Sequence, residues 1–184
     1  ELALQRIRNL TAPLVAELGC GDGRFIRLLL ESGLEQIVGL DISRTNLRRL
    51  ETRIRETPGA SEKVLLIEGD AFAPSFLKGV FDLVIVIGVL QVLDNERYPQ
   101  GLAGCANTLR PGGYLLTIDP TDFGAVMYAI VRHDLEELRQ VLELNTKSVD
   151  IENRTGPRTA VRNVKRIKEA HTAAGLEVEE MMGI

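Results

Sequence analysis

The chain has 184 residues, of which 45% are apolar and 26% are charged, with a formal net charge of −4 and two cysteines. These values are ordinary for one globular domain with a real core, and the acidic balance argues weakly against a nucleic-acid partner. Two cysteines without a CxxC pair indicate neither a disulfide framework nor a metal site, so we expect no metal and a reducing, cytoplasmic setting. The longest apolar run, residues 83–93, is too short for a membrane span.

Short β-rich runs alternate with helical patterns along the chain. The expected strands are residues 14–18, 36–41, 63–69, 81–88, 113–119 and 176–182. The second, third and fourth runs are nearly continuous in apolar residues, as expected for strands buried on both faces. Leu47, Leu50 and Ile54 share one face of an intervening helix, and Ser43 is its expected N-cap. Repeated strand–helix–strand units predict an α/β fold with a doubly wound, mainly parallel sheet.

Residues 121–175 depart from this rhythm because they are helical without a strong strand between the helices. An apolar helical run follows Asp122, a plausible helix cap, and a polar tract follows around residues 145–160. In an open α/β sheet, the segment after a strand starts at the ligand-binding edge. We therefore expect a single domain over residues 1–184, with residues 121–160 forming a helical, lid-like elaboration.

Five arginines decorate the helix expected after the second strand. They are Arg44, Arg48, Arg49, Arg53 and Arg55. Such a cluster occurs in nucleic-acid-binding patches, but a solvated helix face is the commoner arrangement. We interpret the cluster as a solvated face.

Three glycines alternate with other residues directly after the first expected strand, in the sequence VAELGCGDGRF. Gly19, Gly21 and Gly23 lack Cβ atoms and permit positive φ, so their backbone N–H groups can approach a ligand. The helix that follows at Arg24 adds its positive N-terminus. The spacing is neither that of a dinucleotide site, G-x-G-x-x-G, nor that of a phosphate loop, G-x-x-x-x-G-K-[ST]. The pattern favours a ligand without a pyrophosphate.

Acidic residues end the next two strands. Asp41 lies 20 residues beyond Gly21, where a carboxylate can accept hydrogen bonds from both hydroxyls of a ribose. The alternative is an aspartate that stabilises a helix N-terminus. Asp70 could accept a hydrogen bond from the exocyclic amine of adenine, with Ile42 and Phe72 as apolar walls for the ring. Two acidic strand ends beside one glycine loop indicate a nucleoside site.

Five segments between Leu14 and Asp119 resemble class I S-adenosylmethionine-dependent methyltransferases in order and spacing. They are VAELGCGDGRF, VGLDIS, EGDAF, FDLVIVIGVLQVL and LRPGGYLLTID. The resemblance implies the Rossmann-like fold of that family and S-adenosyl-L-methionine as the cofactor. It implies these cofactor-binding residues: Glu17, Gly19, Cys20, Gly21, Gly23, Asp41, Ile42, Asp70, Ala71, Phe72, Ile87, Gly88 and Gln91.

The same resemblance implies roles for individual positions. The glycines would wrap the methionine part and the ribose, and Glu17 would lie near the methionine amino group, bridged by water. The Ala71 amide would meet the adenine edge. Ile87, Gly88 and Gln91 would lie beside the methionine and the sulfonium. Cys20, inside the loop, is interpreted as a small apolar filler.

The chain also departs from the family pattern. Many small-molecule members carry a histidine in the segment that here reads VLQVL, which puts a histidine-assisted role there in doubt. The [DNS]PP[YFW] signature of many amino-methylating nucleic-acid enzymes is replaced by IGVL at residues 87–90. The family normally ends with an antiparallel hairpin, whereas this sequence stops after its sixth expected strand. We therefore expect the last antiparallel strand to be missing from this chain.

Methyl transfer from a sulfonium depends mainly on alignment, and a base helps only when the acceptor is protonated. Asp119 and Asp122 could face an acceptor, although a turn followed by a helix cap is the alternative. His133 and His171 could act as bases because imidazole titrates near neutrality, with a surface position as the alternative. Asp119 and His133 are the candidate catalytic residues.

The sequence thus predicts a methyltransferase that acts on a small-molecule acceptor, with no nucleic-acid partner. The alternative is a non-catalytic S-adenosylmethionine-binding module or a domain of a larger assembly. The acceptor, the attacking atom and the oligomeric state are not specified by the sequence.

Overall fold

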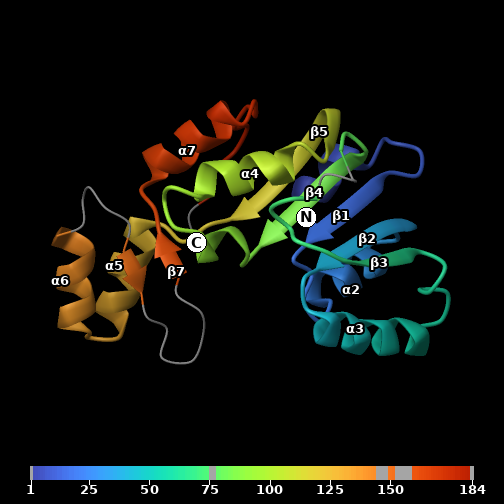
Figure 1. The fold of residues 1–184 in the computed structure, drawn as a ribbon, viewed down its shortest axis with the longest axis horizontal. Coiled ribbons are helices and arrows are strands. Elements are labelled where there is room, and N and C mark those ends of the chain that lie inside the picture. The colour runs from blue at the N-terminus through green and yellow to red at the C-terminus, as the bar shows by residue number, and fades with distance from the viewer. Residues whose placement is uncertain (1, 75–77, 144–148, 152–158, 183–184) are drawn as a thin grey trace. The chain divides into compact units, whose positions relative to one another are not determined.

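The computed structural model describes residues 2–74, 78–143, 149–151 and 159–182 (Figure 1). These residues belong to two compact units. The first unit consists of Glu1–Ile87 and Gly104–Thr117, and the second of Gly88–Ala103 and Ile118–Ile184. The assignment of residues 1–184 to a single domain stays a prediction.

The first unit is built on a five-stranded sheet. Its elements in chain order are α1 (Leu2–Ile7), β1 (Leu14–Leu18), α2 (Arg24–Glu31), β2 (Gln36–Asp41), α3 (Arg44–Glu56), β3 (Val64–Glu68), β4 (Phe81–Ile87) and β5 (Leu109–Ile118). The strand order is β3-β2-β1-β4-β5, with parallel pairing of β1 to β2, β1 to β4 and β2 to β3. Helices α2 and α3 lie next to each other beside β2 and β3 (Figure 1). The predicted α/β fold with a mainly parallel sheet is confirmed.

The register of the sheet places the ends of neighbouring strands side by side. Leu18 of β1 lies opposite Leu40 of β2, and Asp41 lies opposite Glu68 of β3. Parallel strands share one carboxyl edge, where open α/β sheets bind their ligands. The glycine loop, Asp41 and the turn after β3 therefore lie at the carboxyl ends of three adjacent strands.

Helix α3 forms as the apolar periodicity predicts. Leu47, Leu50 and Ile54 are buried in the main core cluster of the first unit. Full burial of such a side chain stabilises the fold by about 1.5–3 kcal/mol. Ser43 caps the helix, because its Oγ accepts a hydrogen bond from the Asn46 N–H at 3.3 Å. Both predictions for this helix are confirmed.

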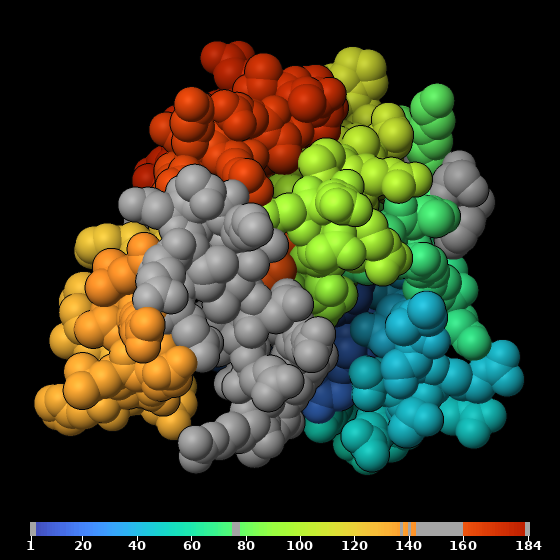
Figure 2. Space-filling view, turned by 60° about the vertical axis from the view of Figure 1, so that its left-hand side comes forward, coloured from blue at the N-terminus to red at the C-terminus, as the bar shows by residue number. Residues whose placement is uncertain are grey.

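The second unit combines helices with a small sheet. Its elements are η2 (Leu90–Val92), most of α4 (Tyr98–Ala106), α5 (Asp122–Val131), α6 (Leu135–Glu143), β6 (Val149–Ile151), β7 (Thr159–Val161) and α7 (Val164–Ala173). Helices α5 and α6, orange in Figure 2, lie side by side, and β6 pairs antiparallel with β7. Ala125, Val141 and Val161 form a small apolar cluster. Among the helices of the described ranges, none is long and apolar enough to cross a membrane.

Two expectations about strands are wrong. Burial of β3 on both faces is contradicted because β3 is an edge of the sheet, and Leu65 is 59% exposed. Residues 176–182 form no strand. Leu176 and Val178 alternate with exposed residues as in a strand, but a strand also needs a hydrogen-bonded neighbour, which such a pattern does not encode.

The elaboration after the fifth strand also differs from expectation. The pair β6–β7 interrupts the segment that we expected to be helical, and residues 144–148 and 152–158 of its polar tract lie outside the described residues. The N-cap of α5 is Thr121, whose Oγ1 accepts from the Gly124 N–H at 3.1 Å, so the cap expected at Asp122 is one residue late.

Candidate functional site

The glycine loop (residues 19–23) follows β1 in a left-handed backbone conformation that glycine adopts most readily. The φ angles are 78° at Gly19, 54° at Gly21 and 89° at Gly23. The Gly19 N–H donates to the Leu40 carbonyl at 2.6 Å, which ties the loop to β2. A Cβ at Gly21 would meet no atom within 4 Å. The loop therefore leaves room for another molecule beside Gly21.

Asp41 connects the glycine loop to the start of α3. Its carboxylate accepts from the Gly21 N–H through Oδ2 and from the Ser43 N–H through Oδ1, both at 2.8 Å. The side chain is buried, yet each carboxylate oxygen can accept a further hydrogen bond. Asp41 thus organises the loop and keeps acceptor capacity for hydroxyl groups.

Glu17 is a buried carboxylic acid on β1, 3% exposed. Its pKa is raised from the ordinary 4.5 to about 8, mainly by burial and to a smaller extent by the negative charge of Asp41, while a hydrogen bond from the Ile26 backbone opposes the rise. Among the described residues, none forms a hydrogen bond with its buried Oε2. Glu17 is therefore mostly neutral at pH 7 and can still bind a polar group.

Cys20 fills space inside the loop. It is 4% exposed, and a Cβ on Gly39 of β2 would lie 3.1 Å from its Sγ. Burial raises the pKa of the thiol to about 12, with smaller contributions from the charges of Glu17 and Asp41. The thiol thus stays protonated, which suits a filler and not a nucleophile.

An exposed apolar side chain follows β2 at this carboxyl edge of the sheet, and an ordered turn follows β3. Ile42 is 74% exposed directly after Asp41. In the turn after β3, Asp70 accepts from the Phe72 N–H through Oδ1 at 2.8 Å, and Ala71 is buried. Among the described residues, none forms a hydrogen bond with the second carboxylate oxygen of the exposed Asp70.

The C-terminal end of α4 packs against the turn at residues 70–72. The Cys105 thiol donates to the Ala71 carbonyl at 3.3 Å. A Cβ on Gly104 would lie 2.1 Å from the Phe72 carbonyl oxygen, a contact closer than atoms can make. The absence of a side chain at Gly104 therefore allows the helix to approach the turn.

The predicted residues after β4 divide between the two units. Ile87 ends β4 in the first unit, whereas Gly88 and Gln91 belong to the second. Gly88 has a φ of 72°, and Gln91 is half-buried in η2. The first unit alone brings together Glu17, the glycine loop, Asp41, Ile42 and the turn at 70–72.

Asp119, directly after β5, belongs to a polar cluster in the second unit. Its Oδ2 accepts from the Tyr98 hydroxyl at 3.1 Å. The guanidinium carbon of Arg162 lies 4.0 Å from the centre of the Tyr98 ring, and Arg162, 2% exposed, also donates to the Leu93 carbonyl. Sequence reasoning missed Tyr98 and Arg162 because neither lies in a recognisable motif near Asp119.

The other acid–base candidates occupy structural positions. His133 is exposed in the turn that ends α5, with a φ of 54° and its N–H bonded to the Ile130 carbonyl at 3.1 Å. His171 on α7 places its Nδ1 2.7 Å from the Ile167 carbonyl oxygen. Asp122 accepts from the Asn163 side-chain amide at 3.0 Å.

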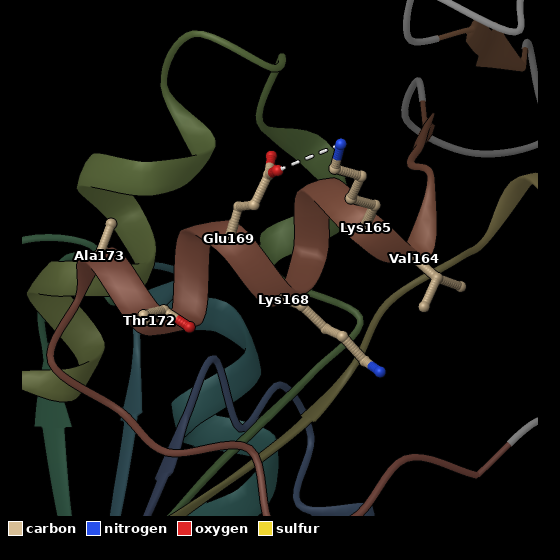
Figure 3. Close-up of a pocket in the computed structure, with 6 residues that line it drawn as sticks. All are labelled: Val164, Lys165, Lys168, Glu169, Thr172 and Ala173. Atoms are coloured by element: carbon tan, nitrogen blue, oxygen red, sulfur yellow. Dashed lines mark ion pairs between the residues drawn. The ribbon is translucent and has the colours of Figure 1, made fainter.

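A surface depression of the second unit follows α7 (Figure 3). The described residues that line it are Val164, Lys165, Lys168, Glu169, Thr172 and Ala173. Lys165 and Glu169 form a long ion pair, with Nζ 3.9 Å from Oε1. None of the predicted site residues is among these lining residues.

Residues 15–113, more than half of the chain, match the model of a family described as "Methyltransferase domain". The solved structure of the PH0226 protein from Pyrococcus horikoshii OT3 is 26% identical, with a TM-score of 0.68 over 99% of this chain and 82% of that one.

Several curated relatives have named activities, of which two illustrate the range. The mRNA cap guanine-N(7) methyltransferase of Saccharomyces cerevisiae is 38% identical over 61 residues, which cover 33% of this chain and 14% of that protein. The malonyl-[acyl-carrier protein] O-methyltransferase of a Paenibacillus species is 29% identical over 116 residues, 61% of this chain and 41% of that protein. The chain spans less than half the length of the curated relatives it matches.

Proposed function

Because the chain belongs to the methyltransferase domain family, we propose that it transfers a methyl group from S-adenosylmethionine to a small-molecule acceptor. The resemblance seen in the sequence is confirmed by this membership, and the family supports S-adenosylmethionine as the cofactor. The observation that carries the proposal is an open, left-handed glycine loop hydrogen-bonded to the buried Asp41 at a shared strand edge.

The residues of the first unit fit this cofactor. Gly21 borders open space, so its missing Cβ leaves room for the ribose and the methionine part. Asp41 is pre-organised by two backbone N–H groups and would accept hydrogen bonds from the ribose hydroxyls. The buried Oε2 of Glu17 would gain a partner on the methionine amino side, which would offset the cost of leaving it unsatisfied.

The adenine end would be held by the turn after β3. Asp70 would accept from the exocyclic amine through its available oxygen, and the Ala71 amide would meet the ring edge. Ile42 supports this assignment because an apolar side chain that is 74% exposed gains from contact with a flat ring. Phe72 would form the opposite wall.

When bound, the cofactor supplies an electrophilic methyl group on a sulfonium. The task of the chain is then to hold the acceptor atom in line with that methyl group. Ile87, Gly88 and Gln91 would border the sulfonium, and Asp119 would accept a proton from an acceptor that requires one. His133 is the second candidate base.

A small acceptor is favoured over a nucleic acid by the residues themselves. The net charge is −4, and residues 87–90 lack the signature of amino-methylating nucleic-acid enzymes. One relative is named for methylating the mRNA cap, and another for a malonyl group on a carrier protein. The second candidate function is an S-adenosylmethionine-binding module without catalysis, which would bind S-adenosylhomocysteine and transfer no labelled methyl group.

We also propose that the segment 121–160, of which the structure describes residues 121–143, 149–151 and 159–160, acts as a lid. In this segment α5 exposes Phe123 and Val131, at 67% and 72%, which a bound acceptor could cover. Hydrogen exchange of the protein with and without S-adenosylhomocysteine and acceptor tests this. A lid should gain protection in α5 and α6 on binding, whereas unchanged exchange there beside protection of residues 19–23 would contradict it.

Calorimetric titration and a labelled-methyl assay test the proposed function. We expect binding of S-adenosylmethionine and S-adenosylhomocysteine in the micromolar range and none of NAD, because the glycine spacing is wrong for a dinucleotide. Transfer of labelled methyl to a compound in a metabolite extract, identified by mass spectrometry, would establish the acceptor. Heat with NAD but none with S-adenosylhomocysteine would overturn the proposal, and transfer to RNA alone would overturn the acceptor class.

A further inference from the structure

The glycine loop needs support from outside itself. Three glycines within five residues lose much conformational entropy on folding and offer no side chains to hold the backbone. The first half of the loop is tied to β2, through Leu40 and Asp41. The second half, Asp22 and Gly23, faces α3.

Helix α3 contacts that second half at two successive residues. Leu50 packs against Gly23 so closely that a Cβ there would lie 2.2 Å from its Cδ1. Arg53, three residues later on the same helix face, donates from Nη1 to the Asp22 backbone carbonyl at 2.7 Å and to its carboxylate at 2.8 Å. The Arg53 side chain therefore hydrogen-bonds to both the backbone and the side chain of Asp22.

We propose that Arg53 is a positioning residue of the S-adenosylmethionine site, which holds the glycine loop in its binding conformation through Asp22. The inference rests on the proposed function. Arg53 acts through the loop, so it needs no contact with the cofactor. This role refines the interpretation of the arginine cluster as a solvated face, since Arg53 is about half exposed yet holds the loop.

Arg55 provides a matched control on the same helix. It pairs with Glu51 at 2.6 Å, and the two side chains of this pair are about as exposed as those of Arg53 and Asp22. The pair lies within α3 and does not touch the loop. Exposed ion pairs contribute little to stability, so both arginine-to-alanine variants should fold.

Calorimetric titration with S-adenosylhomocysteine tests the proposal. Arg53→Ala should bind about three- to ten-fold more weakly than the wild type, the range expected for loss of charge-assisted hydrogen bonds at an exposed site. Arg53→Lys should recover part of the loss, because an ammonium can reach one of the two oxygens. Arg55→Ala should bind like the wild type.

Two further measurements separate positioning from general stability. In a double-mutant cycle, Asp22→Ala and Arg53→Ala should be less than additive in their effect on binding, because both remove part of one contact. Hydrogen exchange in Arg53→Ala should accelerate at residues 21–23 and not in β1. Wild-type affinity in Arg53→Ala, or an equal loss in Arg55→Ala, would overturn the proposal. If the wild-type protein does not bind S-adenosylhomocysteine, the proposed function fails instead.

Discussion

Glu17 offers a direct test of how the site is built. Its carboxylic acid is 3% exposed and has a pKa raised to about 8, whereas its ordinary value is 4.5. Between these two values the folded protein holds a proton that the unfolded chain has lost. The unfolding free energy must therefore fall as the pH rises through this window, because the unfolded state binds fewer protons.

The magnitude follows from the two pKa values. One pKa unit corresponds to about 1.4 kcal/mol. The rise from 4.5 to about 8 therefore means that the fold is about 5 kcal/mol less stable above pH 8, where Glu17 is ionised, than at acidic pH, where it is protonated in both states. Glu17→Gln keeps the shape of the neutral acid and cannot ionise. The variant should gain stability over the wild type progressively from pH 5 to pH 8, with most of the total gain reached within that range.

Denaturant unfolding at several pH values measures this difference. Subtracting the wild-type curve from that of Glu17→Gln isolates the contribution of this carboxylic acid, and Glu62→Gln, at an exposed position, serves as the control for a Glu-to-Gln change outside the site. Parallel curves for Glu17→Gln and the wild type would show that the side chain is ionised in the folded protein. Glu17 would then not be the neutral acid that we expect to bind a polar group in the site.

Three substitutions test other parts of the site. Gly104→Ala places a methyl group 2.1 Å from the Phe72 carbonyl and should cost about 1–3 kcal/mol of stability, measured by chemical unfolding; unchanged stability would contradict the close approach. Asp41→Ala should weaken S-adenosylhomocysteine binding by about 2–3 kcal/mol because charge-assisted hydrogen bonds are lost, and Asp41→Asn should lose less; equal affinities in calorimetry would mean that another group holds the ribose. Gly21→Ala should destabilise the fold by only about 1–2 kcal/mol, through its left-handed backbone, because the added Cβ meets no protein atom within 4 Å. The same methyl group should reduce cofactor binding strongly, and wild-type binding by this variant would show that the ligand lies elsewhere.

Elements whose signals are local could be predicted from the amino-acid sequence alone. Apolar runs and turn residues predicted β1 and β2 with the bounds that the structure has, and β4 within one residue. Apolar spacing predicted the buried face of α3, and the spacing of glycines and acidic strand ends predicted the loop and Asp41. These signals work because helix and strand periods, and the backbone freedom of glycine, act over a few neighbouring residues.

Features that depend on contacts between residues far apart in the sequence became visible only in the folded structure. In the folded structure β3 is an edge strand and residues 176–182 lie outside the sheet, because a strand forms only where a neighbouring strand can hydrogen-bond to it. Folding also places Arg53 on Asp22 and Tyr98 on Asp119, contacts that span 31 and 21 residues of chain. The raised pKa of Glu17 likewise arises from its burial in the packed sheet and, to a smaller extent, from the charge of Asp41. No local pattern encodes these contacts, since each is stabilised by packing that exists only once the chain has folded.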